Sequence, residues 1–194
     1  MTRPRDALLL IDLQEAFFES EQLQRARPEL VAAVHRLTTA AHTAEVPTFL
    51  ITTEHSRDLS TWTLTMLDDD RGFLFHGDET TRAIGELDTA GLTRIEKTRD
   101  SAFFGTDLLL RLGNLGVDTV LLAGVSTHAC IAQTARDAFA NNVRAQVVTD
   151  ATADDRPEHH ASVLQLLAED RQVGMMTVDE ASKRWLGAVR PDEA

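Results

Sequence analysis

Short apolar segments alternate with amphipathic segments along almost the whole chain. The apolar segments are typical of buried β-strands because they are brief and are bounded by turn residues. They predict strands over residues 6–11, 47–52, 93–96, 117–123, 143–149 and 173–177. The amphipathic segments predict helices over residues 28–45, 107–115, 129–141, 157–170 and 179–186. This alternation favours the α/β class, as a three-layer α/β/α Rossmann-like fold with a six-stranded parallel sheet.

Length and composition narrow the class of protein further. The 194 residues contain no repeat or long linker, so we expect a single domain over residues 1–194. No apolar run is long enough to span a bilayer, and the lone cysteine favours a reducing, cytoplasmic setting. The formal charge of −12 argues against nucleic acid and membrane partners, because phosphate groups need a basic surface.

Three chemically capable side chains directly follow predicted strands. Asp12 follows the first strand, Lys97 the third, and Cys130 lies just beyond the fourth. Ligands of parallel α/β sheets bind beyond the carboxyl ends of the strands. We therefore expect these three residues to meet at that edge of the sheet.

Each of the three residues also has a plain structural interpretation. Cys130 can be a small core residue, Asp12 a helix cap and Lys97 a surface charge. A thiol near a helix start, however, meets the positive end of the helix dipole, which lowers its pKa. The apolar neighbours of Asp12 predict partial burial, which suits a general base. Lys97 is one of only two lysines, and its charge would favour a thiolate.

The motifs around these residues resemble those of the isochorismatase-like cysteine hydrolases, and their order and spacing agree over residues 6–180. The first motif joins Asp12, Leu13 and Gln14 to Phe17 or Phe18. The second is Lys-Thr-Arg-Asp-Ser-Ala-Phe over residues 97–103. The third covers residues 124–138, and Asp-Ala at 150–151 matches a further signature.

The resemblance implies a role for three residues of the motifs. Cys130 becomes the nucleophile, Asp12 the general base and acid, and Lys97 the electrostatic partner. The family also carries a cis peptide bond before the cysteine, here between Val125 and Ser126. The backbone N–H groups of Ser126 and Cys130 would then form an oxyanion hole.

The implied activity is that of a metal-independent cysteine hydrolase, an amidohydrolase that cleaves a C–N bond of a small amide, ureido or carbamoyl compound. Residues 52–58 lack the Asp-x-His metal motif of family nicotinamidases, and we expect His55 and His76 to be surface residues. No metal and no cofactor are therefore predicted. By analogy with the family we expect a homodimer or homotetramer acting on a small-molecule substrate.

Two alternatives stay open. Isochorismatases cleave a vinyl ether by acid chemistry, and Asp12 could serve as that acid because the lysine motif is similar to theirs. A catalytically inactive binding protein of the same fold is the other alternative.

Several further residues are candidates for a substrate pocket, although aromatic residues at such spacings also form cores. They are Gln14, Phe17, Trp62, Phe103, Thr127 and His128. His159 and His160 lie on a predicted helix, and we expect them to be solvated.

Overall fold

A single parallel sheet forms the centre of the protein in a computed structural model that describes residues 5–187. Its strand order is β3-β2-β1-β4-β5-β6, and every neighbouring pair is parallel, which confirms the predicted six-stranded parallel sheet. The strands are β1 (Asp6–Ile11), β2 (Thr48–Thr53), β3 (Thr93–Lys97), β4 (Thr119–Gly124), β5 (Arg144–Thr152) and β6 (Val173–Met176).

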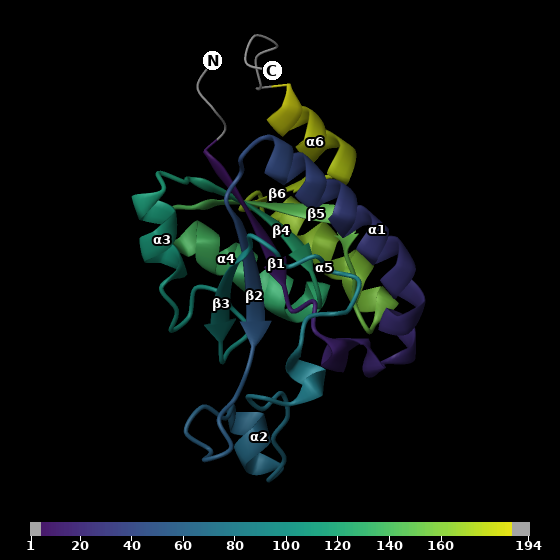
Figure 1. Cartoon of the computed structure of the whole chain (residues 1–194), viewed down its shortest axis with the longest axis vertical. Coiled ribbons are helices and arrows are strands. Elements are labelled where there is room, and N and C mark those ends of the chain that lie inside the picture. The colour runs from purple at the N-terminus through teal and green to yellow at the C-terminus, as the bar shows by residue number, and fades with distance from the viewer. Residues whose placement is uncertain (1–4, 188–194) are drawn as a thin grey trace.

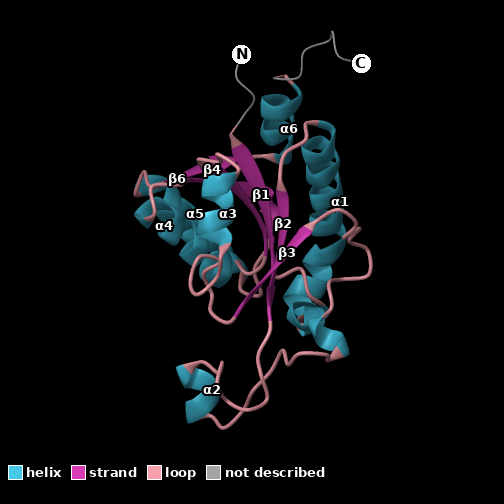
Figure 2. Ribbon diagram, turned by 60° about the vertical axis from the view of Figure 1, so that its left-hand side comes forward, coloured by secondary structure: helices cyan, strands magenta, loops and turns pink. Residues whose placement is uncertain are grey.

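Helices cover both faces of this sheet and complete three layers. The helices are α1 (Glu21–Thr43), α2 (Leu64–Asp68), α3 (Leu108–Asn114), α4 (Ala132–Ala140), α5 (Pro157–Glu169) and α6 (Val178–Leu186). Figure 2 shows α1 and α6 on one side of the sheet and α3, α4 and α5 on the other. Within the described residues, no helix is both long and apolar enough to cross a bilayer.

The central strand shows why the apolar runs predict this arrangement. All six residues of β1 are buried, because helices lie over both of its faces. Leu8 and Leu10 point into the core beneath α1, whereas Leu9 and Ile11 point into the core beneath α3 and α4. Successive strand residues face opposite sides, so a strand covered on both sides must be apolar throughout.

Helix α1 begins earlier than the sequence pattern predicts. The expected start at Pro28 is wrong, since the helix begins at Glu21 and Pro28 lies inside it. The Ser20 hydroxyl caps the helix by accepting the N–H of Leu23 at 3.2 Å. Leu23 and Leu30 are both buried on the core side of this helix. That packing retains the first turns although proline cannot donate a backbone hydrogen bond.

Residues 56–75 form a lobe that projects beyond the carboxyl ends of β2 and β3 and carries α2 (Figure 1). The two ends of the lobe meet at its base. His55 forms a bridge with Phe75, and the His55 N–H donates to the Leu74 carbonyl at 2.7 Å. The lobe therefore leaves and rejoins the body of the protein at one place.

Gly124 ends β4 and is paired with Ile11 of β1, just before the chain turns away from the sheet. Its φ is +120°, a value that side chains rarely allow. A Cβ atom on Gly124 would lie 2.0 Å from the Ile11 carbonyl oxygen. That oxygen also accepts the Val125 N–H at 3.0 Å. No other residue type fits this junction without moving the backbone.

Replacing Gly124 with alanine is expected to destabilise the fold. The clash and the positive φ together should lower the free energy of unfolding by about 3 kcal/mol, or the Tm by roughly 6–12 °C. Thermal unfolding followed by circular dichroism measures the change. Gly113→Ala is the matched control, because Gly113 lies in α3 with nothing within 4 Å of the added Cβ. Equal unfolding midpoints for the two variants would contradict this account.

Candidate active site

The site lies at the carboxyl edge of the sheet, where three neighbouring strands end. Asp12 follows β1, Thr53 ends β2 and Lys97 ends β3, and Thr53 is paired with Lys97 in the sheet. Asp12 has a φ of +54°, a left-handed conformation that aspartate tolerates better than most residues. Its backbone N–H donates to the Ile51 carbonyl at 2.9 Å, which fixes the carboxylate beside β2.

Lys97 and Asp12 form a fully buried ion pair. The Lys97 Nζ atom lies 2.8 Å from Asp12 Oδ2, and both side chains are 0% exposed. Thr53 Oγ1 accepts a hydrogen bond from Lys97 Nζ at 2.6 Å and donates one to Asp12 Oδ1 at 2.8 Å. The threonine therefore completes the hydrogen bonding of both charges. Thr53 was absent from the predicted site, although the end-of-strand rule that selects Lys97 applies to it equally.

Cys130 also lies beside this ion pair. It follows β4, which neighbours β1 on the side away from β2 and β3. Its Sγ atom lies 3.5 Å from Lys97 Nζ, and the residue is 6% exposed. The structure thus brings Asp12, Lys97 and Cys130 together at the predicted edge.

The local structure around Cys130 differs from the predicted helix start near residue 129. A π-helical turn spans Thr127–Ile131, and α4 begins only at Ala132. Cys130 therefore lies inside a wider turn rather than at the first turn of an α-helix. Turns of this kind often occur at functional sites.

Burial dominates the titration behaviour of the thiol. It raises the pKa of Cys130 well above the usual value, the negative charge of Asp12 raises it further, and Lys97 opposes both effects. The prediction that a helix dipole lowers this pKa is wrong, because the thiol is enclosed. Burial also acts to lower the pKa of Lys97, but Asp12 and Cys130 outweigh it and raise that pKa above its usual value. Burial and Asp12 thus favour the neutral thiol, whereas Lys97 favours the thiolate.

Next to the Thr127–Ile131 turn, one backbone N–H group has no acceptor among residues 5–187. The peptide bond between Val125 and Ser126 is cis. Val125 N–H donates to Ile11 and Thr127 N–H donates to Ala153, whereas the Ser126 N–H has no acceptor within residues 5–187. This N–H group is free to bind an oxygen of a ligand.

The predicted pocket residues fall into different environments. Gln14 is fully buried, and its amide donates to the Thr53 and Thr81 carbonyls and accepts the Thr53 N–H, so both of its donors are used within the protein. Phe17 and Phe103 are half-buried and pack against the two halves of the core.

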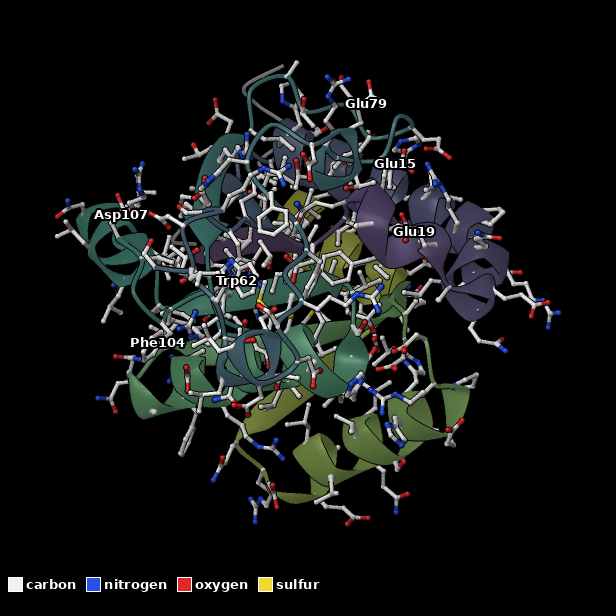
Figure 3. The ribbon with its side chains drawn as sticks, turned by 90° about the horizontal axis from the view of Figure 1, so that it is seen from below. Glu15, Glu19, Trp62, Glu79, Phe104 and Asp107 are labelled. Atoms are coloured by element: carbon white, nitrogen blue, oxygen red, sulfur yellow. The ribbon has the colours of Figure 1, made fainter. Side chains whose placement is uncertain are left out.

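Trp62 belongs to the lobe. It is half-buried, and its indole N–H donates to the Ser56 carbonyl at 3.0 Å. Seen from the carboxyl end of the sheet, Trp62 lies near the centre, with Phe104 and Asp107 to one side and Glu15 and Glu19 to the other (Figure 3). Two Arg99 contacts, to the carbonyls of Thr61 at 2.9 Å and Trp62 at 3.2 Å, link the lobe to the loop after Lys97.

Histidines depart most from their predicted positions. His55 is 1% exposed rather than on the surface, and its Nδ1 lies 2.9 Å from the Thr61 carbonyl. Burial lowers the pKa of His55. His160 is half-buried rather than solvated, and its Nδ1 lies 2.8 Å from Thr127 Oγ1. His76 is 45% exposed at its side chain, so its predicted surface position is confirmed.

Three side chains with possible metal-ligand atoms gather near the ends of β2 and β3. Ligand atoms of Glu54, His76 and Glu96 lie within 4.8 Å of one another. The Arg94 guanidinium, however, already pairs with the Glu54 carboxylate and supplies the positive charge there. These residues do not fit the Asp-x-His site of family nicotinamidases.

Curated relatives share part of the sequence. The phenazine biosynthesis protein PhzD of Pseudomonas fluorescens is 38% identical over 86 residues, which are 44% of this chain and 41% of that protein. The maleamate amidohydrolase of Pseudomonas putida is 41% identical over 75 residues, which are 39% of this chain and 35% of that protein. Each match therefore spans about two fifths or less of the relative's length.

The fold and the whole-length sequence pattern agree with these partial matches. The crystal structure of a cysteine hydrolase from Pseudomonas syringae pv. phaseolicola 1448A superposes with a TM-score of 0.86. The superposition covers 95% of this chain and 94% of that one at 21% identity, so it establishes the fold. The sequence model of the isochorismatase domain matches residues 6–180. A match over nearly the whole chain shows that the protein belongs to the isochorismatase family.

Proposed function

We propose that this protein is a metal-independent cysteine hydrolase that cleaves a C–N bond of a small amide, ureido or carbamoyl compound. The observation that carries the proposal is the contact of the buried Lys97 ammonium with both the Asp12 carboxylate and the Cys130 sulfur. A nucleophile, a base and a fixed positive charge are the groups that acyl transfer through a thioester needs. The maleamate amidohydrolase relative supports amide chemistry.

The first half of the reaction forms the thioester. Asp12 takes the thiol proton, and Cys130 Sγ attacks the carbonyl carbon of the substrate. The backbone N–H groups of Ser126 and Cys130 hold the resulting oxyanion. Asp12 then gives its proton to the leaving nitrogen, and the C–N bond breaks.

The second half releases the acid. Asp12 takes a proton from water, and the water oxygen attacks the thioester carbon. The tetrahedral intermediate collapses with cleavage of the C–S bond, and the sulfur regains its proton from Asp12. Lys97 remains charged throughout and stabilises the negative charge that moves between Asp12 and the sulfur.

Vinyl ether hydrolysis is a second candidate function. It is favoured by a probable isochorismatase of Pseudomonas chlororaphis that is 37% identical over 86 residues. In this chemistry Asp12 would act as an acid that protonates the substrate, and Cys130 would not be needed as a nucleophile.

Alkylation by iodoacetamide tests whether Asp12 activates Cys130. We expect the wild type to be alkylated rapidly at neutral pH, although burial raises the pKa of the thiol, because Asp12 removes the proton during attack. Asp12→Asn should slow this reaction by about 100-fold, within the range of general base catalysis. Intact-protein mass spectrometry measures the rate, with Cys130→Ser as the blank. A wild-type thiol that reacts only after denaturation would contradict the proposal.

Activity of Cys130→Ala separates the two candidate functions. Incubation with a panel of small amides, maleamate included, should release ammonia from the wild type and none above background from Cys130→Ala. If the variant instead keeps turnover of isochorismate while both proteins leave every amide intact, the ether hydrolase is the correct function.

Lys97→Met should move the reactivity of Cys130 to higher pH. Removing this cation takes away a neighbouring charge that lowers the pKa of the thiol. The loss should also cost about 3–5 kcal/mol of stability, because Asp12 remains buried without its partner. The pH profile of alkylation and urea unfolding measure the two effects. Lys183→Met, at the only other lysine and on the exposed side of α6, should change neither.

A further inference from the structure

The turn that carries Cys130, Thr127–Ile131, is called the nucleophile turn here, and residues that follow β5 hold it in place. Thr127 donates twice to the Ala153 carbonyl, through its backbone N–H and through its hydroxyl, each at 3.0 Å. A hydroxyl has one proton, so the contact of Thr127 Oγ1 with His160 Nδ1 at 2.8 Å is donated by the histidine. The first residue of the turn is thus attached both to the residue that follows β5 and to α5.

Asp154 holds the second residue of the turn. Its side chain is 0% exposed. Asp154 Oδ2 accepts the backbone N–H of His128 at 2.7 Å, and Oδ1 accepts that of Arg156 at 3.0 Å. Both oxygens also lie within 2.9 Å of His128 Nδ1. Burial raises the pKa of Asp154, but these hydrogen bonds outweigh it and lower the pKa below its usual value.

The remaining contacts of His128 define its orientation. Arg156 Nη2 lies 2.8 Å from His128 Nε2, and because a guanidinium only donates, this nitrogen accepts. Nδ1 then carries the proton that is donated to Asp154. Both ring nitrogens are used within the protein, which argues for a structural role of His128 rather than the predicted contact with substrate.

We propose that Asp154 is the positioning residue of the nucleophile turn, acting through the backbone N–H and the imidazole of His128. The proposal rests on the proposed role of Cys130 as nucleophile. The mechanism does not use Asp154, yet a carboxylate is costly to bury unless its bonds repay the desolvation. The turn is only five residues long, from Thr127 to Ile131, so a shift of His128 displaces Cys130 relative to Asp12. Misplacement by about 1 Å can slow catalysis by two orders of magnitude.

Asp154→Asn tests the proposal, because the amide cannot accept from the His128 N–H, the His128 ring and the Arg156 N–H together. We expect iodoacetamide to alkylate Cys130 about tenfold more slowly in this variant. Asp150→Asn is the matched control. Asp150 lies near the end of β5 and also accepts a backbone N–H, that of Val178 at 2.8 Å, but it holds α6 rather than the nucleophile turn. The control should react at the wild-type rate.

A double-mutant cycle separates positioning from a general loss of stability. If Asp154 acts by placing Cys130 against Asp12, Asp154→Asn should not slow alkylation further in a protein that already carries Asp12→Asn. If the two residues act independently, the two fold-reductions in alkylation rate would multiply. Unfolding midpoints show that each variant is folded at the assay temperature. Should Asp154→Asn not fold, His128→Ala takes its place in the cycle, since it removes the imidazole and keeps the backbone bond.

The outcomes distinguish this inference from the proposed function. Wild-type alkylation that does not depend on Asp12 would overturn the proposed function itself. The positioning role alone would be overturned by a different result. In that case wild-type alkylation depends on Asp12, but Asp154→Asn reacts at a rate within twofold of that for Asp150→Asn. Multiplicative slowing in the cycle would also overturn it.

Discussion

The buried ion pair of Lys97 and Asp12 is the interaction on which the candidate site depends. Neither charge is exposed to water, so each would be strongly destabilised without the other. The Lys97 and Asp12 side chains reach each other only because β1, β2 and β3 are adjacent and in register, with Thr53 beside Lys97. Thr53 donates to one partner and accepts from the other, which satisfies both. The chemistry of the site and the alignment of three strands are therefore parts of one arrangement.

Much of this arrangement follows from short-range patterns. A strand covered on both faces must be apolar throughout, so β1 and β4 are recognisable from a few residues. The carboxyl-edge rule then selects Asp12, Lys97 and Cys130 without knowledge of any contact. Their convergence could be predicted because parallel strands place their ends at the same edge, whatever the loops between them do.

What could not be predicted depends on partners distant in sequence. The start of α1 at Glu21 depends on core contacts that outweigh the effect of Pro28. The burial of His55 results from the closure of the lobe. The contacts of Asp154 and His160 with the nucleophile turn join residues 26 or more positions apart, and no local pattern reports them. The pKa of Cys130 was predicted in the wrong direction for the same reason, since enclosure is a property of the assembled fold.

The closed base of the lobe has a consequence for how such an enzyme can diversify. Because the chain leaves and returns at the His55–Phe75 bridge, insertions or deletions that keep this bridge and the Arg99 contacts change mainly the entropy of closing that loop. The strands that hold the charged pair and the thiol would keep their register. This surface segment can therefore vary in length and sequence while the carboxyl edge that holds Asp12, Lys97 and Cys130 is kept.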